Sequence, residues 1–214
     1  MAVITEITAQ KKKKDRCNIF VDGAFFCGLQ AETVMKYRLK AGTAVAAEEL
    51  EAMQMESERL QAFDCALNFL SNAMKTKRQI ADHLEKKGYL GGVIEACLEK
   101  LEYYGYLDDG AYAKAYVKAY GEKKGERLMR CELFQKGIAP EEIDRALEDA
   151  EDRQLSGARA TAEKYYARRR GEENAVQKTY RYLLSKGYAY EICKQAIRAV
   201  SYTHLRAHET AANL

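Results

Sequence analysis

Lysines and arginines interleaved with tyrosines are the residues of this chain whose types and spacing suit chemistry, and that chemistry is the binding of nucleic acid. One cluster surrounds Tyr112, Tyr116 and Tyr120, and a second surrounds Tyr165 and Tyr166. Cationic side chains neutralise phosphates, and tyrosine rings accept stacked bases. The candidate binding residues predicted on this basis are Lys114, Lys118, Lys123, Lys124, Arg127, Arg130, Lys136, Arg168, Arg169, Arg170, Lys178 and Arg181.

Each cluster also has a structural interpretation, which the sequence leaves open. Tyr112, Tyr116 and Tyr120 are spaced four residues apart, so they form one stripe of a helix, and such a stripe is typical of a half-buried packing face. Three arginines at 168–170 suit the negative end of a helix dipole as well as a phosphate. The run Lys11–Lys14 fits a solvated turn as well as a nucleic-acid contact.

The distribution of charge says more about partners than the net charge of +3 does. Residues 48–58 hold five acids and no base, and residues 141–152 hold seven acids and one base. In contrast, residues 114–137 hold seven bases against three acids, and residues 153–198 hold eleven against four. The electrostatic part of any binding to a polyanion is therefore expected in the second half of the chain.

The sequence shows no motif for catalysis, a metal or a cofactor. Catalysis needs a nucleophile beside a base, paired carboxylates, a metal cluster or a glycine loop that cradles phosphates. Gly91-Gly92 is interpreted as a turn and not as such a loop. His83 lies in an amphipathic helical pattern and is interpreted as a partly exposed structural residue. The six cysteines include no CxxC pair, so reduced core thiols are expected rather than disulfides or zinc ligands. We expect no enzyme and no cofactor.

The elements that must position the basic residues are written in a phrase that the chain repeats three times. The copies are KKGYLGGVIEACL at 86–98, QKGIAPEEIDRAL at 135–147 and SKGYAYEICKQAI at 185–197. When they are aligned on their glycines, a leucine stands four residues before each glycine. The phrase predicts that each glycine ends one helix and that a second helix follows. The aligned glycines are Gly88, Gly137 and Gly187.

A further helical pattern precedes each copy, so the unit is predicted to hold three helices. Asp108 is expected to cap one helix, and Pro140 to stand in the first turn of another. A period near fifty residues indicates a tandem array whose units pack on one another. The predicted repeats are 57–107, 108–155 and 156–200.

The ends of the chain differ from the repeats. Asp22-Gly23 between two apolar runs predicts a hairpin, within an antiparallel sheet of two or three strands. Residues 1–56 are therefore expected to form a β extension with short helices, and 39–43 a turn. Residues 201–214 follow no repeat and are interpreted as a non-native or disordered tail. His204 and His208 have the spacing of a metal-binding pair on a helix, but no second ligand pair accompanies them, so no metal site is predicted there.

The location expected from the sequence is the cytoplasm. No apolar run approaches the roughly 20 residues that span a bilayer. The N-terminus lacks the charged and apolar pattern of a secretory signal. No membrane partner is expected.

Several motifs in the middle of the chain resemble the signature of the RecX family of recombinase regulators. They fall in the family's order and run from Gly105 to Ile138: GYLDD at 105–109, YA at 112–113, YV at 116–117, KG at 124–125 and ELFQKGI at 132–138. The resemblance covers about residues 63–200, and the N-terminal segment resembles the β extension of some members.

The resemblance implies a mainly α fold of three tandem three-helix repeats in an elongated, curved array after a small N-terminal sheet. It also implies a non-enzymatic protein that binds the RecA–single-stranded DNA filament, with double-stranded DNA as a further candidate partner. Members commonly inhibit the ATPase activity, strand exchange and growth of that filament. The chain departs from the family at Tyr120, where an arginine is frequent, and at Gln177, where the first two copies have arginine.

Two other classes of protein fit the residues. One is a helical scaffold that docks another protein through apolar grooves, and the other is a DNA-binding protein with no recombinase partner. Salt dependence separates the scaffold from both DNA-binding classes, because affinity that depends on phosphate contacts falls steeply with salt.

Overall fold

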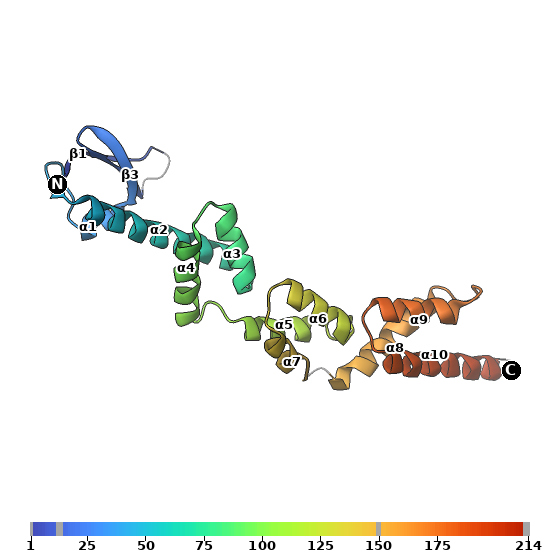
Figure 1. Ribbon diagram of the computed structural model, residues 1–214. Helices are drawn as coiled ribbons and strands as arrows, with labels where there is room; N and C mark the ends of the chain where they lie inside the picture. The colour runs from blue at the N-terminus through green and yellow to red at the C-terminus, as the bar shows by residue number, and fades with distance from the viewer. Residues whose placement is uncertain (1, 12–14, 149–150, 212–214) are drawn as a thin grey trace. The chain divides into compact units, whose positions relative to one another are not determined.

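The structure is a computed structural model that describes residues 2–11, 15–148 and 151–211, with the backbone alone for 151–152 and 201–211. The chain divides into two compact units. The first comprises Met1–Lys75 and Gln79–Leu107, and the second comprises Thr76–Arg78 and Asp108–Leu214. Figure 1 labels the helices of both units, with β1 and β3.

A four-stranded antiparallel sheet opens the first unit, in the order β3-β2-β1-β4. The strands are β1 (Ala2–Ala9), β2 (Arg16–Val21), β3 (Ala24–Gln30) and β4 (Ala44–Val45). Asp22 and Gly23 have φ angles of 50° and 82°, and a type I′ hairpin turn needs positive values at both, so the predicted hairpin is confirmed.

The sheet has four strands where the sequence analysis expected two or three. The missed strand, β4, directly follows the segment 39–43 that was interpreted as a turn. Two residues are too few to leave an alternating pattern in the sequence. Of the predicted lysine run, Lys12 to Lys14 lie outside the described residues.

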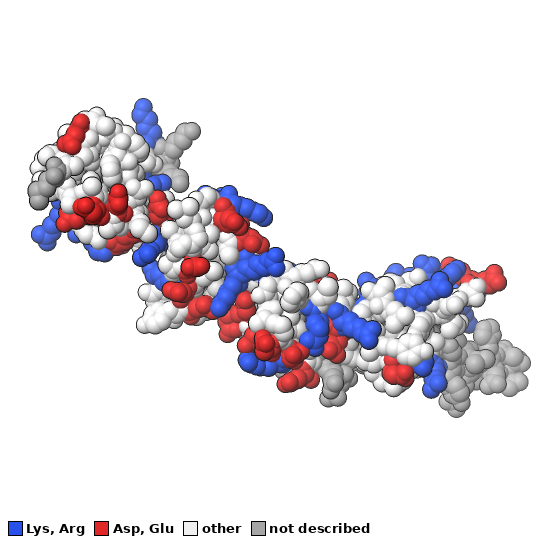
Figure 2. Space-filling view, viewed as in Figure 1, with Lys and Arg blue, Asp and Glu red and all other residues white. Residues whose placement is uncertain are grey.

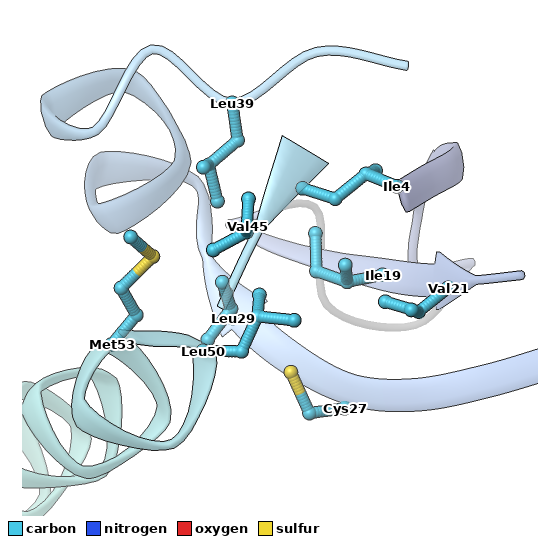
Figure 3. Close-up of a cluster of buried hydrophobic side chains, with 9 residues drawn as sticks. All are labelled: Ile4, Ile19, Val21, Cys27, Leu29, Leu39, Val45, Leu50 and Met53. Carbon is cyan, nitrogen blue, oxygen red and sulfur yellow. The ribbon is translucent and has the colours of Figure 1, made fainter. Parts of the chain in front are cut away.

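The buried face of the sheet packs against two helices, α1 (Ala31–Lys36) and α2 (Ala47–Leu70). Figure 3 shows the side chains of this core, in which strand residues such as Ile19 and Leu29 meet Leu50 and Met53 of α2. Ser57 of α2 is fully buried, and its Oγ accepts a hydrogen bond of 2.8 Å from the backbone N–H of Gln30 at the end of β3.

Helix α2 contributes to two cores. Its first half covers the sheet, and its second half places Ala62 and Ala66 in the core of the first repeat. The helix spans 24 residues and crosses the predicted boundary at residues 56 and 57. No glycine or proline stands between Gly42 and Gly88, so nothing in the sequence interrupts it.

The first repeat is completed by α3 (Lys77–Lys86) and α4 (Gly91–Tyr103). Its core includes Ile80, Leu84 and Leu101. Gly91 and Gly92, interpreted from the sequence as a turn, are instead the first two residues of α4.

The second unit contains two further three-helix groups. The first is α5 (Asp109–Tyr120), α6 (Glu126–Gln135) and α7 (Pro140–Glu148), with α5 packed on α7. The second is α8 (Glu151–Ala167), α9 (Ala175–Ser185) and α10 (Tyr190–Ala211), with α8 packed on both others (Figure 1). Within the described part of the chain no strand follows Val45.

The predicted helix boundaries are confirmed at the positions with a clear local cause. Gly88, Gly137 and Gly187 follow helix ends with φ angles of 89°, 85° and 84°, the left-handed conformation that favours glycine. The Asp108 carboxylate accepts a hydrogen bond of 2.7 Å from the backbone N–H of Ala111, and Pro140 is the first residue of α7.

The predicted repeat boundaries stay predictions, and α8 runs across the one at residues 155 and 156. Helix α10 continues to Ala211, past Val200, where the repeated pattern ends. The side chains of 201–211 and all of 212–214, with His204 and His208, lie outside the described residues. The interpretation of 201–214 as a non-native or disordered tail therefore also stays a prediction.

The second and third repeats meet through their backbones at two glycines. The N–H of Gly125 donates to the carbonyl oxygen of Lys186 at 2.8 Å, and the N–H of Arg127 donates to that of Gly187 at 3.1 Å. A Cβ added to Gly125 would lie 2.2 Å from the carbonyl carbon of Gly187. The start of α6 thus satisfies its unpaired N–H groups on the carbonyls at the end of α9.

Two further contacts hold this junction, which we call the glycine junction. The buried Gln154 of α8 accepts a hydrogen bond of 3.0 Å from the N–H of Glu126 through its Oε1. Gly157 of α8 lies against the backbone of Glu122, where an added Cβ would be 2.9 Å from the carbonyl oxygen. A side chain at Gly125 or at Gly157 would therefore push the second and third repeats apart.

Replacing Gly187 with Ala should destabilise the protein more than replacing Gly88 with Ala. Both glycines have a positive φ near 85° to 90°, which costs alanine about 1–2 kcal/mol. The new methyl at position 187 would also lie 2.4 Å from the backbone nitrogen of Leu128, whereas position 88 has nothing within 4 Å. We expect an additional loss of about 1–3 kcal/mol for Gly187→Ala, measured by denaturant unfolding followed by circular dichroism. Equal losses would show that the junction contributes nothing to stability.

Candidate nucleic-acid interface

All twelve predicted binding residues lie in the second unit. Lys114 and Lys118 stand on α5, Lys123 and Lys124 in the following loop, and Arg127 and Arg130 on α6. The others stand at or beyond the ends of helices or on α9: Lys136, Arg168, Arg169, Arg170, Lys178 and Arg181. Figure 2 shows Lys and Arg side chains gathered over α9 and acidic side chains over α7.

Lys124 is bound within the fold. Its Nζ lies 2.6 Å from Oε2 of Glu132 and 2.8 Å from the hydroxyl of Tyr116, which itself hydrogen-bonds to Glu132. The same Nζ lies over the ring of Tyr120 at 4.5 Å from its centroid. The side chains of Lys124 and Glu132 are 24% and 29% exposed, so solvent screens this ion pair only in part.

The pKa values of this network show which interaction dominates. Burial acts to lower the pKa of Lys124, but its hydrogen bonds to Glu132 and Tyr116 outweigh burial and raise that pKa above its ordinary value. Burial acts to raise the pKa of Glu132, and the same hydrogen bonds bring it below its ordinary value. The stability from this pair is therefore present at neutral pH. It is lost only as the pH falls through the lowered pKa of Glu132 or rises through the raised pKa of Lys124.

Three more predicted residues have carboxylate partners. Arg130 contacts Glu126 at 3.2 Å and also binds Asp144. Lys178 lies 3.0 Å from Glu172, and Arg169 lies 3.8 Å from the same carboxylate. Their charges are partly neutralised by the protein itself.

Six of the predicted residues are exposed and, among the described residues, have no carboxylate within ion-pairing distance. They are Lys114, Lys118, Lys123, Arg127, Arg168 and Arg181. Lys136 lies over the ring of Tyr112, 6.0 Å from its centroid. The six exposed cations leave the most positive charge open to a partner.

The tyrosine stripe of α5 is mainly a packing face. Tyr112 and Tyr116 are half-buried against the core of the second repeat, and their ring centroids are 6.5 Å apart. The ring centroids of Tyr116 and Tyr120 are 4.6 Å apart. The structural interpretation of Tyr112 and Tyr116 is therefore confirmed, whereas Tyr120 is 40% exposed.

A groove of about 560 Å³ combines basic residues and tyrosines from the two clusters that are separate in the sequence. The loop between α5 and α6, α8 and the end of α9 form its walls. Four cations line it, namely Lys123, Lys164, Arg168 and Lys186. We call it the basic groove.

Two of the four cations, Lys164 and Lys186, were not among the predicted residues. Each had a signal in the sequence. Lys164 stands one helical turn before Arg168, and Lys186 precedes the third aligned glycine. Their meeting with Lys123 depends on contact between two repeats, which a local pattern does not record.

Two tyrosines also line the basic groove. The rings of Tyr165 and Tyr182 are stacked with centroids 4.0 Å apart and planes 12° apart. Arg169 lies over Tyr165 at 4.5 Å, and Lys186 lies over Tyr182 at 5.3 Å. These are cation–π distances, and such contacts fix a cation above a ring.

One contact in the first unit has the elements of nucleophilic chemistry. Sγ of Cys65 lies 3.6 Å from Nε2 of His83, and the His83 ring is stacked flat on Phe69 at 4.1 Å. The pair leaves no local signal in the sequence, because the two residues are 18 apart and on different helices. The expectation that His83 is a partly exposed structural residue agrees with its half-buried ring.

All six cysteines, Cys65 included, are free thiols, and their surroundings differ. Burial raises the pKa of Cys27 and that of Cys97 to about 11, so both are protonated at neutral pH. The described residues contain no group of three or more side chains that could hold a metal ion.

Of the helices in the described part of the chain, none has the length and apolar character needed to cross a bilayer.

Comparison with known protein families gives four matches in chain order. Residues 2–46 match the N-terminal domain of the regulatory protein RecX. Residues 62–101, 108–147 and 151–197 match the first, second and third three-helix domains of RecX. The three domains correspond to the three helix groups of the structure.

Relatives and solved structures agree with these matches. Regulatory protein RecX of Clostridium botulinum (strain Eklund 17B / Type B) is 31% identical over 92% of this chain and 96% of its own length. RecX of Clostridium beijerinckii is also 31% identical, over 94% of this chain and 96% of its own length. A crystal structure of regulatory protein RecX is similar with a TM-score of 0.71 and 30% identity, over 91% of this chain and 98% of that one. The chain therefore belongs to the RecX family.

Replacing Lys124 with Met should destabilise the second unit, because it leaves the partly buried Glu132 without its cation. We expect a loss of about 1–3 kcal/mol and a lower melting temperature by circular dichroism. Lys123→Met is the matched control, because the neighbouring side chain is exposed and has no such partner, and a change within about 0.5 kcal/mol is expected there. Equal effects of the two changes would contradict a structural role for Lys124.

Proposed function

We propose that this protein is a non-enzymatic regulator that binds the RecA–single-stranded DNA filament and inhibits its ATPase activity, strand exchange and growth. The identity of the recombinase follows from the resemblance to the RecX family, since charge and fold alone cannot name a partner. The single structural observation that supports a nucleic-acid component is the basic groove, where four cations converge.

The twelve predicted residues are proposed to contribute unequally to binding. The six exposed cations without a carboxylate partner would supply most of the attraction to phosphates. Lys124, Arg130 and Lys178 would supply less, because they bind Glu132, Glu126, Asp144 and Glu172 within the fold. Double-stranded DNA is a further candidate partner on the same electrostatic grounds.

A second candidate function, protein docking without nucleic acid, is favoured by one observation. A mostly apolar groove of about 430 Å³ lies between α6 and α7, and Phe134 in its wall is 62% exposed. Exposed aromatic side chains of this kind are common at protein interfaces. A filament regulator would use such a surface to contact protein, so this groove fits both functions.

RecA ATPase activity on single-stranded DNA should fall as this chain is added. Inhibition well below one molecule per recombinase monomer would indicate capping of filament ends, and near-stoichiometric inhibition would indicate binding along the filament. The measurement is ATP hydrolysis at fixed RecA and DNA.

A control separates filament binding from simple capture of DNA. If the chain only sequesters the strand, excess single-stranded DNA restores the ATPase activity and the chain shows no binding to RecA protein, which would identify a DNA-binding protein without a recombinase partner. No effect of folded protein at tenfold excess over RecA would contradict the proposed function and favour the docking scaffold.

A further inference from the structure

We propose that the basic groove binds the sugar–phosphate backbone of one DNA strand and does not read its bases. This inference rests on the proposed function and names the part of the nucleic acid that the second unit contacts. It is carried by the arrangement of four cations and two tyrosines around the groove.

The groove favours a negatively charged occupant. Lys123, Lys164, Arg168 and Lys186 come from three segments and face one space. No carboxylate of the described residues lies within ion-pairing distance of their nitrogen atoms. Like charges held together repel one another, and phosphates that enter between them relieve that repulsion.

The acidic residue in the wall does not balance these charges. Glu122 lines the groove, and its backbone is committed to the glycine junction. Its carbonyl oxygen lies 3.4 Å from the hydroxyl of the buried Tyr188, which is placed to donate to it. Four cations therefore face one exposed carboxylate.

The two tyrosines are not available for stacking on bases. Tyr165 and Tyr182 cover each other's inner faces at 4.0 Å. Because no cation fits between rings so close, Arg169 and Lys186 must lie over their other faces. A base would have to displace a cation in order to stack, so the rings position the positive charges rather than bind the strand themselves.

The size of the groove suits the backbone of one strand. About 560 Å³ holds a short stretch of a single strand. A positively charged groove that follows the backbone is the common feature of proteins that bind single strands without sequence preference. The expected ligand is therefore a single strand of any sequence.

An abasic strand tests the central claim with the full chain and without RecA. A fluorescent oligothymidylate and an abasic oligonucleotide with the same number of phosphates should bind with affinities within about twofold of each other, because the contacts are to phosphate. The measurement is fluorescence anisotropy at several salt concentrations. A tenfold preference for the strand with bases would overturn the inference.

A pair of substitutions tests the location. Lys164→Gln with Arg168→Gln removes two groove cations, so the log–log salt slope of binding should fall by about 0.7 for each, or about 1.4 together. Between 50 and 200 mM salt this makes the affinity of the variant about sevenfold less sensitive to salt than that of the parent. An unchanged slope in a folded variant, checked by circular dichroism, would overturn the assignment.

The matched control removes the same charge from the same repeat outside the groove. Arg159 and Arg198 are exposed and do not line the groove, and Arg159 stands on the opposite side of α8 by helical periodicity. Arg159→Gln with Arg198→Gln should change the slope by much less. Equal changes in the two double variants would show that only net charge matters and would overturn a specific groove.

The outcomes that would overturn this inference differ from those that would overturn the proposed function. Absence of any binding to DNA alone would overturn the groove inference, whereas inhibition of RecA could persist through protein contacts. Displacement of the oligonucleotide by poly-glutamate of equal charge, as efficient as displacement by unlabelled DNA, would identify an acidic protein as the occupant and overturn it too. Stronger competition by DNA than by poly-glutamate supports the inference.

Discussion

The contact between Gly125 and Gly187 is the constraint on which the rest of the second unit depends. The start of α6 presents N–H groups that lack a helical partner, and the end of α9 presents carbonyls that lack one. Bonds from Gly125 to Lys186 and from Arg127 to Gly187 satisfy both ends at once. The two helix ends also carry opposite partial charges, which adds to the attraction. Only glycine permits this approach, because a Cβ at either position would lie within 2.5 Å of the opposing backbone or side chain.

The same contact creates the basic groove. Lys123 lies two residues before Gly125, and Lys186 directly precedes Gly187, so the junction brings both side chains to one space. Cations there are also favoured by the protein itself. Arg168 follows the end of α8 and Lys186 follows the end of α9, where the negative end of each helix dipole attracts positive charge. The helix-end interpretation of the arginines at 168–170 and the phosphate interpretation are therefore compatible, since both place a cation at a helix end.

Local sequence was sufficient to predict several elements whose cause lies within a few residues. Asp22-Gly23 predicts its turn through backbone conformation, Asp108 predicts a helix start through its carboxylate, and Pro140 through its fixed φ. Two of the features that were missed depend on residues far apart in sequence. The strand β4 exists because β1 pairs with it, and the contact of Cys65 with His83 exists because two helices pack. The candidate site was predicted in part for the same reason, because charge patterns identify cations but not the partners that neutralise Lys124 or Arg130.

The repeated phrase shows how one local signal serves three different surroundings. A lysine precedes the aligned glycine in every copy, and the glycine ends a helix each time. Around Gly88 an added Cβ would meet nothing within 4 Å, whereas Gly187 lies against Leu128. Lys136 lies over a tyrosine ring, and Lys186 lines the basic groove. Repetition therefore fixes the helix ends, and the packing between repeats decides which copy of the lysine faces a site. A binding surface can arise in one repeat in this way without any change to the signal that folds all three.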